Sequence, residues 1–146
     1  MQLFANPQTL RNEILNMSAT CGLDSQCFGK MLDYTIRLFE TQGLGKEYYG
    51  YHNITHELEV TYITLIVLKW KSLVNDIKDD DFKYLFAAAL FHDFDPQKSV
   101  DKPHEDNVVK FLTQDQNLAQ LFKDANLDIN IIMALILRTT YPWAGK

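Results

Sequence analysis

Apolar residues recur along the chain at intervals of three and four positions, which is the spacing of one face of an α-helix. The first such segment follows Asn6 and Pro7, which suit the N-cap and the first position of a helix, and it closes at Gly22. A second begins at Asp24 or Ser25. The pattern predicts further helices over the ranges of about 53–70, 79–90, 103–112, 117–123 and 128–139.

Strand-like alternation and internal repeats are absent from the sequence pattern. Residues 60–67 are rich in β-branched side chains, but the length of the surrounding segment and its flanking Glu and His residues favour a helix. Residues 129–137 are apolar on every side, which predicts the most buried helix. We therefore expect an all-α fold, a single compact helical domain of about six or seven helices over residues 1–146. Within it, residues 1–45 are the N-terminal helices and residues 48–140 hold the chemistry.

The composition of the chain argues against some classes of binding partner. The formal net charge of −5 argues against nucleic acid, because binding to phosphate backbones needs clustered Lys and Arg. The N-terminus lacks the pattern of a secretory signal, and no apolar stretch approaches the ~20 residues that cross a bilayer. Cys21 and Cys27 are too few for a zinc site and are interpreted as reduced thiols. These features predict a cytoplasmic protein with no membrane association.

The four histidines fall in three short clusters, and each cluster includes an acid or an amide. His52 and His56 are four positions apart, so on a helix they project from the same side and can converge on one site. The third cluster contains His104. A single histidine on a helix is usually structural. The evidence for a functional site is therefore the order of the three clusters and the residues around them.

His92 and Asp93 form the second cluster. Neighbours in a regular helix point about 100° apart, so this pair works as a double ligand only near a helix end. Phe94, Asp95 and Pro96 follow at once and supply such an end. An imidazole nitrogen and a carboxylate oxygen together suit a divalent metal.

Three segments, YHNITHELEV, AAALFHDFDP and DKPHEDNVVKFL, resemble in order and surroundings the motifs of the HD-domain superfamily of metal-dependent phosphohydrolases. The resemblance covers residues 48–112 and implies an HD-domain-like helical fold. It implies that His56, His92 and Asp93 bind a metal. It also implies that His52, at the pocket mouth, binds phosphate or acts as a general acid, and that Glu105 orients or deprotonates the attacking water.

The resemblance further implies that His104 binds substrate phosphate or a second metal. Lys98 and Lys102 are candidates for neutralising phosphate charge, although solvated loop lysines are an equally good interpretation. The family pattern includes a further Asp on a downstream helix, and no acid follows Asp128, which resembles the N-cap of that helix. We therefore expect three protein ligands, with the last Asp beyond residue 146 or lacking. Asp95 or Asp106 is a possible substitute.

The expected function is hydrolysis of phosphate monoesters or diesters, of nucleotide type, by a water that a divalent metal activates. The metal is Mn, Mg, Fe, Ni or Zn, and the sequence does not choose among them. The expected partner is a small phosphorylated substrate, and a homo-oligomer is possible. Two alternatives stay open: a di-iron oxygenase or hydratase of HD type, and a catalytically incomplete nucleotide-binding module.

Overall fold

The computed structural model describes residues 6–41, 54–92, 94 and 105–137, and within these ranges the regular structure is entirely helical. Residues 60–67 are helical, as predicted. The helices are α1 (Pro7–Thr20), α2 (Ser25–Thr41), α3 (Ile54–Lys71), α4 (Asp79–Phe91), α5 (Glu105–Gln114), α6 (Gln116–Asp124) and α7 (Ile129–Leu137). These bounds confirm the predicted all-α single domain with about seven helices.

Side-chain caps determine where the first two helices begin. The Asn6 Oδ1 accepts a hydrogen bond from the backbone N–H of Thr9 at 2.8 Å, which caps α1. The Asp24 Oδ1 accepts from the N–H of Gln26 at 2.9 Å, which caps α2. Between them the chain turns at Gly22, whose φ of +82° lies in the left-handed region that glycine adopts without strain. All three positions agree with the sequence interpretation.

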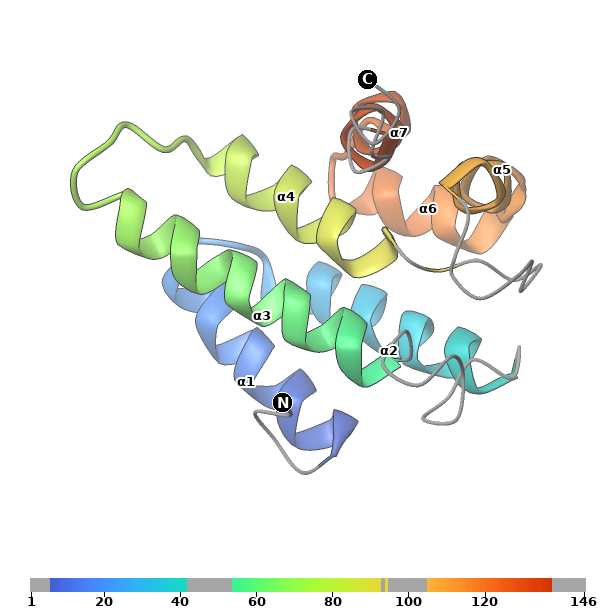
Figure 1. Ribbon diagram of the computed structural model, residues 1–146, viewed down its shortest axis with the longest axis horizontal. Coiled ribbons are helices and arrows are strands. Elements are labelled where there is room, and N and C mark those ends of the chain that lie inside the picture. Colours follow the sequence, from blue (N-terminus) through green and yellow to red (C-terminus); the bar gives the residue numbers. More distant parts are fainter. Residues whose placement is uncertain (1–5, 42–53, 93, 95–104, 138–146) are drawn as a thin grey trace, which may run out of the picture.

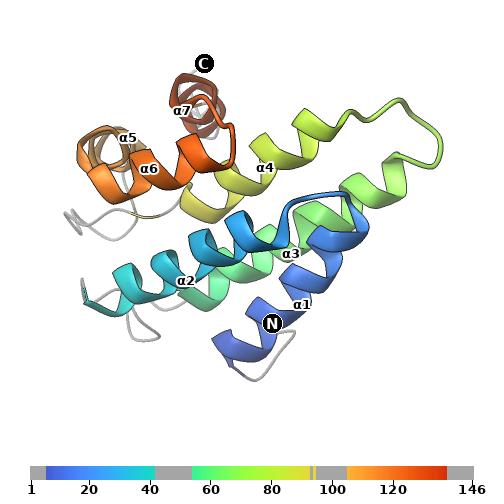
Figure 2. The same ribbon diagram turned by 180° about the vertical axis from the view of Figure 1, so that it is seen from behind.

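Helix α3 lies at the centre of the arrangement that positions the site. It packs against α1 on one side and against α4 on the other, and α4 in turn packs against α7. Figure 1 shows α3 and α4 side by side as a helical hairpin, and Figure 2 shows α2 from behind, next to α1 and α6. Because the hairpin is antiparallel, the first turns of α3 face the end of α4.

Aromatic side chains join α4 to the helices around it. Phe86 and Phe28 of α2 meet edge to face, with ring centroids 4.8 Å apart. One turn and a half further along α4, Phe91 meets Phe122 of α6 in the same manner at 5.7 Å. Phe86 and Phe91 are fully buried. Aromatic pairs of this geometry add stability beyond the burial of their area, so α4 is held firmly in the core.

Helix α7 is less buried than its sequence predicts. Ile132 and Ile136 are fully buried, but Ile131 and Leu137 are each 43% exposed, so the expectation of the most buried helix is wrong. Helix α7 packs against α4 and α5, which cover only part of its circumference. An apolar composition shows that a helix can be buried, but the positions of the neighbouring helices determine which of its faces are buried. None of the helices in the described residues has the length and apolarity needed to cross a bilayer.

The carboxylate of Asp115 accepts two hydrogen bonds that stabilise different parts of the fold. It caps α6 by accepting from the N–H of Leu118 at 3.0 Å, and it accepts from the hydroxyl of Tyr34 on α2 at 2.8 Å. Burial, and then the neighbouring carboxylate, raise the pKa of Tyr34, so its hydroxyl stays a donor. Asp115→Ala is expected to lower the free energy of unfolding by about 2 kcal/mol, of which the cap and the tyrosine bond each contribute about half.

Urea denaturation measures this effect, and Asn6→Ala is the matched control, since Asn6 caps α1 alone and its loss is expected to cost about 1 kcal/mol. Equal losses in the two variants would show that the Tyr34 bond contributes nothing.

Candidate metal centre

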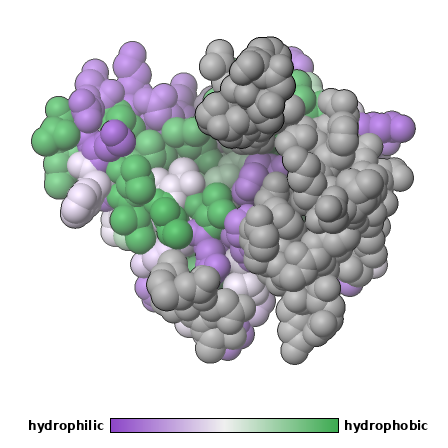
Figure 3. Space-filling model, in the orientation of Figure 1, coloured by the Kyte–Doolittle hydropathy of each residue, from purple (hydrophilic) through white to green (hydrophobic). Residues whose placement is uncertain are grey.

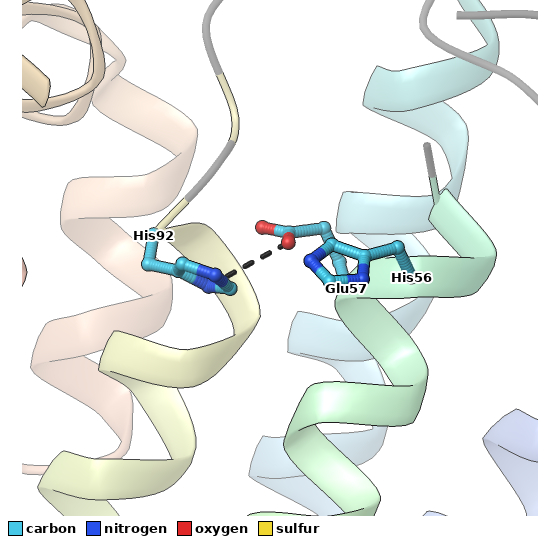
Figure 4. Close-up of side chains that lie close together, drawn as sticks. All are labelled: His56, Glu57 and His92. Carbon is cyan, nitrogen blue, oxygen red and sulfur yellow. Dashed lines mark ion pairs between the residues drawn. The ribbon is translucent and has the colours of Figure 1, made fainter. Parts of the chain in front are cut away.

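Three side chains converge where α3 begins and α4 ends. His56 and Glu57 come from the first turns of α3, and His92 caps the end of α4. Figure 4 shows the three side chains pointing toward one another across the seam between the two helices. Each offers one ligand atom, and these atoms all lie within 4.8 Å of one another. The imidazole centroids of His56 and His92 are 5.9 Å apart, and the His92 Nδ1 lies 3.5 Å from the Glu57 Oε2.

A backbone carbonyl determines which nitrogen of His92 is available. The His92 Nδ1 lies 2.7 Å from the carbonyl oxygen of Ala89. A carbonyl oxygen only accepts, so the hydrogen is assigned to Nδ1, which donates to Ala89, and in the uncharged form of the ring the lone pair is then on Nε2. This bond is much shorter than the 3.5 Å to Glu57 and is the one that orients the ring. Metal-binding histidines are commonly held in this way by their second nitrogen.

The chain is anchored just after His92. Helix α4 ends at Phe91, and the N–H of Phe94 donates to the Phe91 carbonyl oxygen at 3.1 Å. The Phe94 side chain is fully buried, with its ring centroid 4.8 Å from that of Phe39 and 4.9 Å from that of Phe111. The backbone that carries His92 is therefore held on both sides. The helix end predicted around His92 is confirmed.

Glu57 is the member of the site that sequence reasoning missed. Its side chain is fully buried. It lies on the face of α3 that also carries the buried Ile54 and Thr61, three positions before it and four positions after it. An acid on the core face of a helix is a usable signal, because burial of an isolated carboxylate is costly and acids are seldom fully buried without a partner. Glu57 and His56 are neighbours, yet both reach the same seam from the start of the helix.

The donor set fits a divalent metal ion. Two imidazole nitrogens and one carboxylate oxygen suit Mn, Fe, Ni or Zn. The end of α4 adds to this preference, since the last carbonyls of a helix carry partial negative charge that favours a cation. The structure therefore supports a possible metal-binding group of His56, Glu57 and His92. It does not distinguish one metal from another.

The other residues predicted for the site fall largely beyond the described ranges. His56 and His92 are brought together as predicted. Glu105 is the first residue of α5, and its side chain is not among those described. The remaining predicted residues lie outside the described residues: His52, Asp93, Lys98, Lys102 and His104. Their roles stay predictions.

The two cysteines do not suggest thiol chemistry. Both are free, Cys21 is buried and Cys27 is partly buried. Desolvation by burial raises the pKa of each thiol, and the nearby Asp24 carboxylate adds to the shift at Cys27. A raised pKa keeps a thiol protonated near neutral pH, whereas a nucleophilic cysteine needs a lowered one. The chemistry of the described residues therefore lies with the histidines and Glu57.

Comparison with known proteins does not indicate a function for the chain. The chain matches no protein-family model, and it has no significant match among curated proteins or solved structures. An all-helical fold alone does not indicate a function, since one fold supports many sites. The functional assignment therefore depends on the geometry and chemistry of His56, Glu57 and His92.

Proposed function

We propose that the chain is an HD-type, metal-dependent hydrolase of phosphate esters. The observation that carries the proposal is the convergence of His56 and His92. They belong to two separate motifs of the sequence, and the α3–α4 hairpin brings their rings within 5.9 Å of each other, centroid to centroid. The buried carboxylate of Glu57 supplies a third donor at the same point. Two sequence motifs that come together beside a buried acid, where α3 contacts α4, support a metal centre more strongly than either motif alone.

His56, Glu57 and His92 would hold the metal, and Asp93 is proposed as a further ligand. When bound, a divalent metal lowers the pKa of a coordinated water and polarises a phosphoryl oxygen. The two imidazoles and the Glu57 carboxylate would leave a divalent cation with one net positive charge, and Asp93 would neutralise it, so the lysines proposed below would supply the attraction for an anionic phosphate. A catalytic metal site keeps positions open for water and substrate, which four protein ligands would allow at an octahedral ion such as Mn²⁺.

The remaining roles follow the sequence motifs and are part of the same proposal. Glu105 would orient or deprotonate the attacking water, and His52 would protonate the departing alkoxide. His104, Lys98 and Lys102 would bind the phosphate. The substrate is then a small phosphate monoester or diester.

Metal content and hydrolysis, measured together, test this proposal. Elemental analysis of the gently purified full chain is expected to find about one metal per chain. The Mn²⁺-loaded protein is expected to hydrolyse p-nitrophenyl phosphate or bis(p-nitrophenyl) phosphate. In His56→Ala and His92→Ala the metal affinity and the activity are each expected to fall by more than roughly 100-fold, the upper range for removal of outer-shell groups, so little metal is expected to remain after purification.

The control is Asp76→Asn, which removes an exposed carboxylate outside the site. Its metal content and activity are expected to match those of the parent chain. Two irons per chain with an absorbance that changes on reduction would instead indicate an oxygenase or hydratase. Stoichiometric metal with no turnover of either ester would indicate a binding module. Metal content that survives both histidine variants contradicts the proposed centre.

A further inference from the structure

A groove of about 270 Å³ leads away from the candidate metal centre. Val60 and Thr64 of α3 form one wall, Leu85 of α4 and Leu135 of α7 form others, and His92 lines it as well. The groove therefore shares a residue with the candidate centre. Figure 3 shows hydrophobic residues gathered over α3 and α4 on this face of the molecule. A substrate group bound there would lie next to whatever the centre holds.

Helical spacing explains why the groove and the centre are continuous. Val60 and Thr64 follow His56 at steps of four, so the three lie on one face of α3. Because α4 runs in the opposite direction, Leu85 lies about two turns before His92 on the facing side. At a pitch of 5.4 Å per turn, the groove extends roughly 11 Å from the histidines. The small side chains at 88 and 89 also line it and leave room between the helices.

The lining is suited to an uncharged, apolar occupant. Among the described residues that form it, no side chain except the imidazole of His92 can carry a charge. The one hydroxyl, that of Thr64, donates its hydrogen to the carbonyl oxygen of Val60 at 2.7 Å. A nucleobase brings several donors and acceptors, and burying them without partners costs about 1–3 kcal/mol for each group. An alkyl chain brings none.

Larger hollows elsewhere do not compete for this role. One of about 430 Å³ lies between α4 and α6, and Lys83 and Lys123 line it. Neither it nor the other described hollows of similar size includes His56, Glu57 or His92. Size alone would favour these hollows, but continuity with the reacting groups favours the smaller groove.

We propose that this groove binds the alkyl part of an aliphatic phosphate ester, so that the alcohol of the substrate is aliphatic rather than a nucleoside. The inference rests on the proposed function, because the phosphate is placed at the metal centre. It deepens that function by naming the leaving group. Exposed Ile63 and Val67 on α3, 47% and 45% exposed, extend the apolar surface of this helix toward solvent for a longer chain.

Non-hydrolysable phosphonates test the inference on the full chain loaded with Mn²⁺. Calorimetric titration compares methyl-, butyl- and hexylphosphonate with adenosine monophosphate. Each methylene that enters the groove is expected to tighten binding about fourfold. Leu135→Asn makes the wall polar, and Thr64→Leu fills the groove by a larger apolar side chain. Thr64 is the position for filling rather than Ala89, because the Ala89 carbonyl orients His92. Both variants are expected to flatten the dependence on chain length and to leave methylphosphonate binding unchanged.

Leu137→Asn is the matched control, since Leu137 is an exposed leucine of the same helix that does not line the groove. It is expected to keep the full dependence on chain length. Equal affinity for the three phosphonates overturns the aliphatic subsite while leaving the metal centre in place. Tighter binding of adenosine monophosphate than of hexylphosphonate, insensitive to Leu135→Asn, also overturns it. If the chain takes up no metal and does not bind methylphosphonate, the proposed function itself is wrong, and the inference about the groove is then wrong as well.

Discussion

Addition of excess Mn²⁺ to the metal-free chain is expected to raise its melting temperature by roughly 5–10 °C. A ligand that binds only the folded state at 100 times its Kd stabilises that state by about 2.7 kcal/mol. For a domain of this length, each kcal/mol moves the midpoint by roughly 2–4 °C. The physical source is Glu57, which is fully buried beside His92. A cation offers that carboxylate a strong partner in a region where water is excluded.

Differential scanning calorimetry measures the shift, and two variants locate its origin. Glu57→Gln keeps the shape of the side chain and removes its charge, and His92→Ala removes an imidazole. Both are expected to lose most of the Mn²⁺-dependent rise. Asp76→Asn, an exposed carboxylate elsewhere, is expected to keep it. A rise of the same size in all the variants would mean that Mn²⁺ binds at a different place, such as the acidic start of α4.

Phe86→Ala is expected to lower the free energy of unfolding by about 3–5 kcal/mol. The Phe86 side chain is fully buried and meets Phe28 edge to face at 4.8 Å. Its loss removes a large apolar area from the core, leaves a cavity and breaks the aromatic contact that joins α2 to α4. Because native domains are stable by only about 5–15 kcal/mol, this is a large fraction of the total.

Denaturation by guanidinium chloride gives the change, and Trp70→Ala provides the contrast. Trp70 is also a large aromatic residue, but it is 77% exposed, so its loss is expected to change stability by no more than about 0.5 kcal/mol. A loss below about 1.5 kcal/mol in Phe86→Ala would show that the core around α4 collapses to fill the space.

The helices were predictable because their signals are local. Asn6, Pro7 and Asp24 mark starts by their own side chains or ring, and the apolar spacing between such marks carries the rest. The burial of α7 was not predictable in the same way. Its composition is apolar throughout, but Ile131 and Leu137 remain 43% exposed because of where α4 and α5 lie, which no local pattern contains.

The same distinction between local signals and tertiary packing applies to the candidate metal centre. His56 and His92 were predicted as joint ligands from the resemblance of their two motifs to the HD superfamily, and the helix end at His92 is the local feature that agrees with it. Glu57 was missed because a Glu beside a His in a helix looks like a solvated neighbour until α4 packs against that face. Only the pairing of α3 with α4 makes it a buried donor. The position of Asp93 stays a prediction, since it lies outside the described residues.

Phe94 fixes the position of the chain just after His92. Its ring is fixed between Phe39 and Phe111, two residues after His92. Insertions or replacements in residues 95–104 would begin beyond this fixed point and need not displace the imidazole. Sequence variation after Phe94 and preservation of the His92 imidazole are therefore largely independent of each other, so the candidate centre could be inherited unchanged while the residues that follow it diverge.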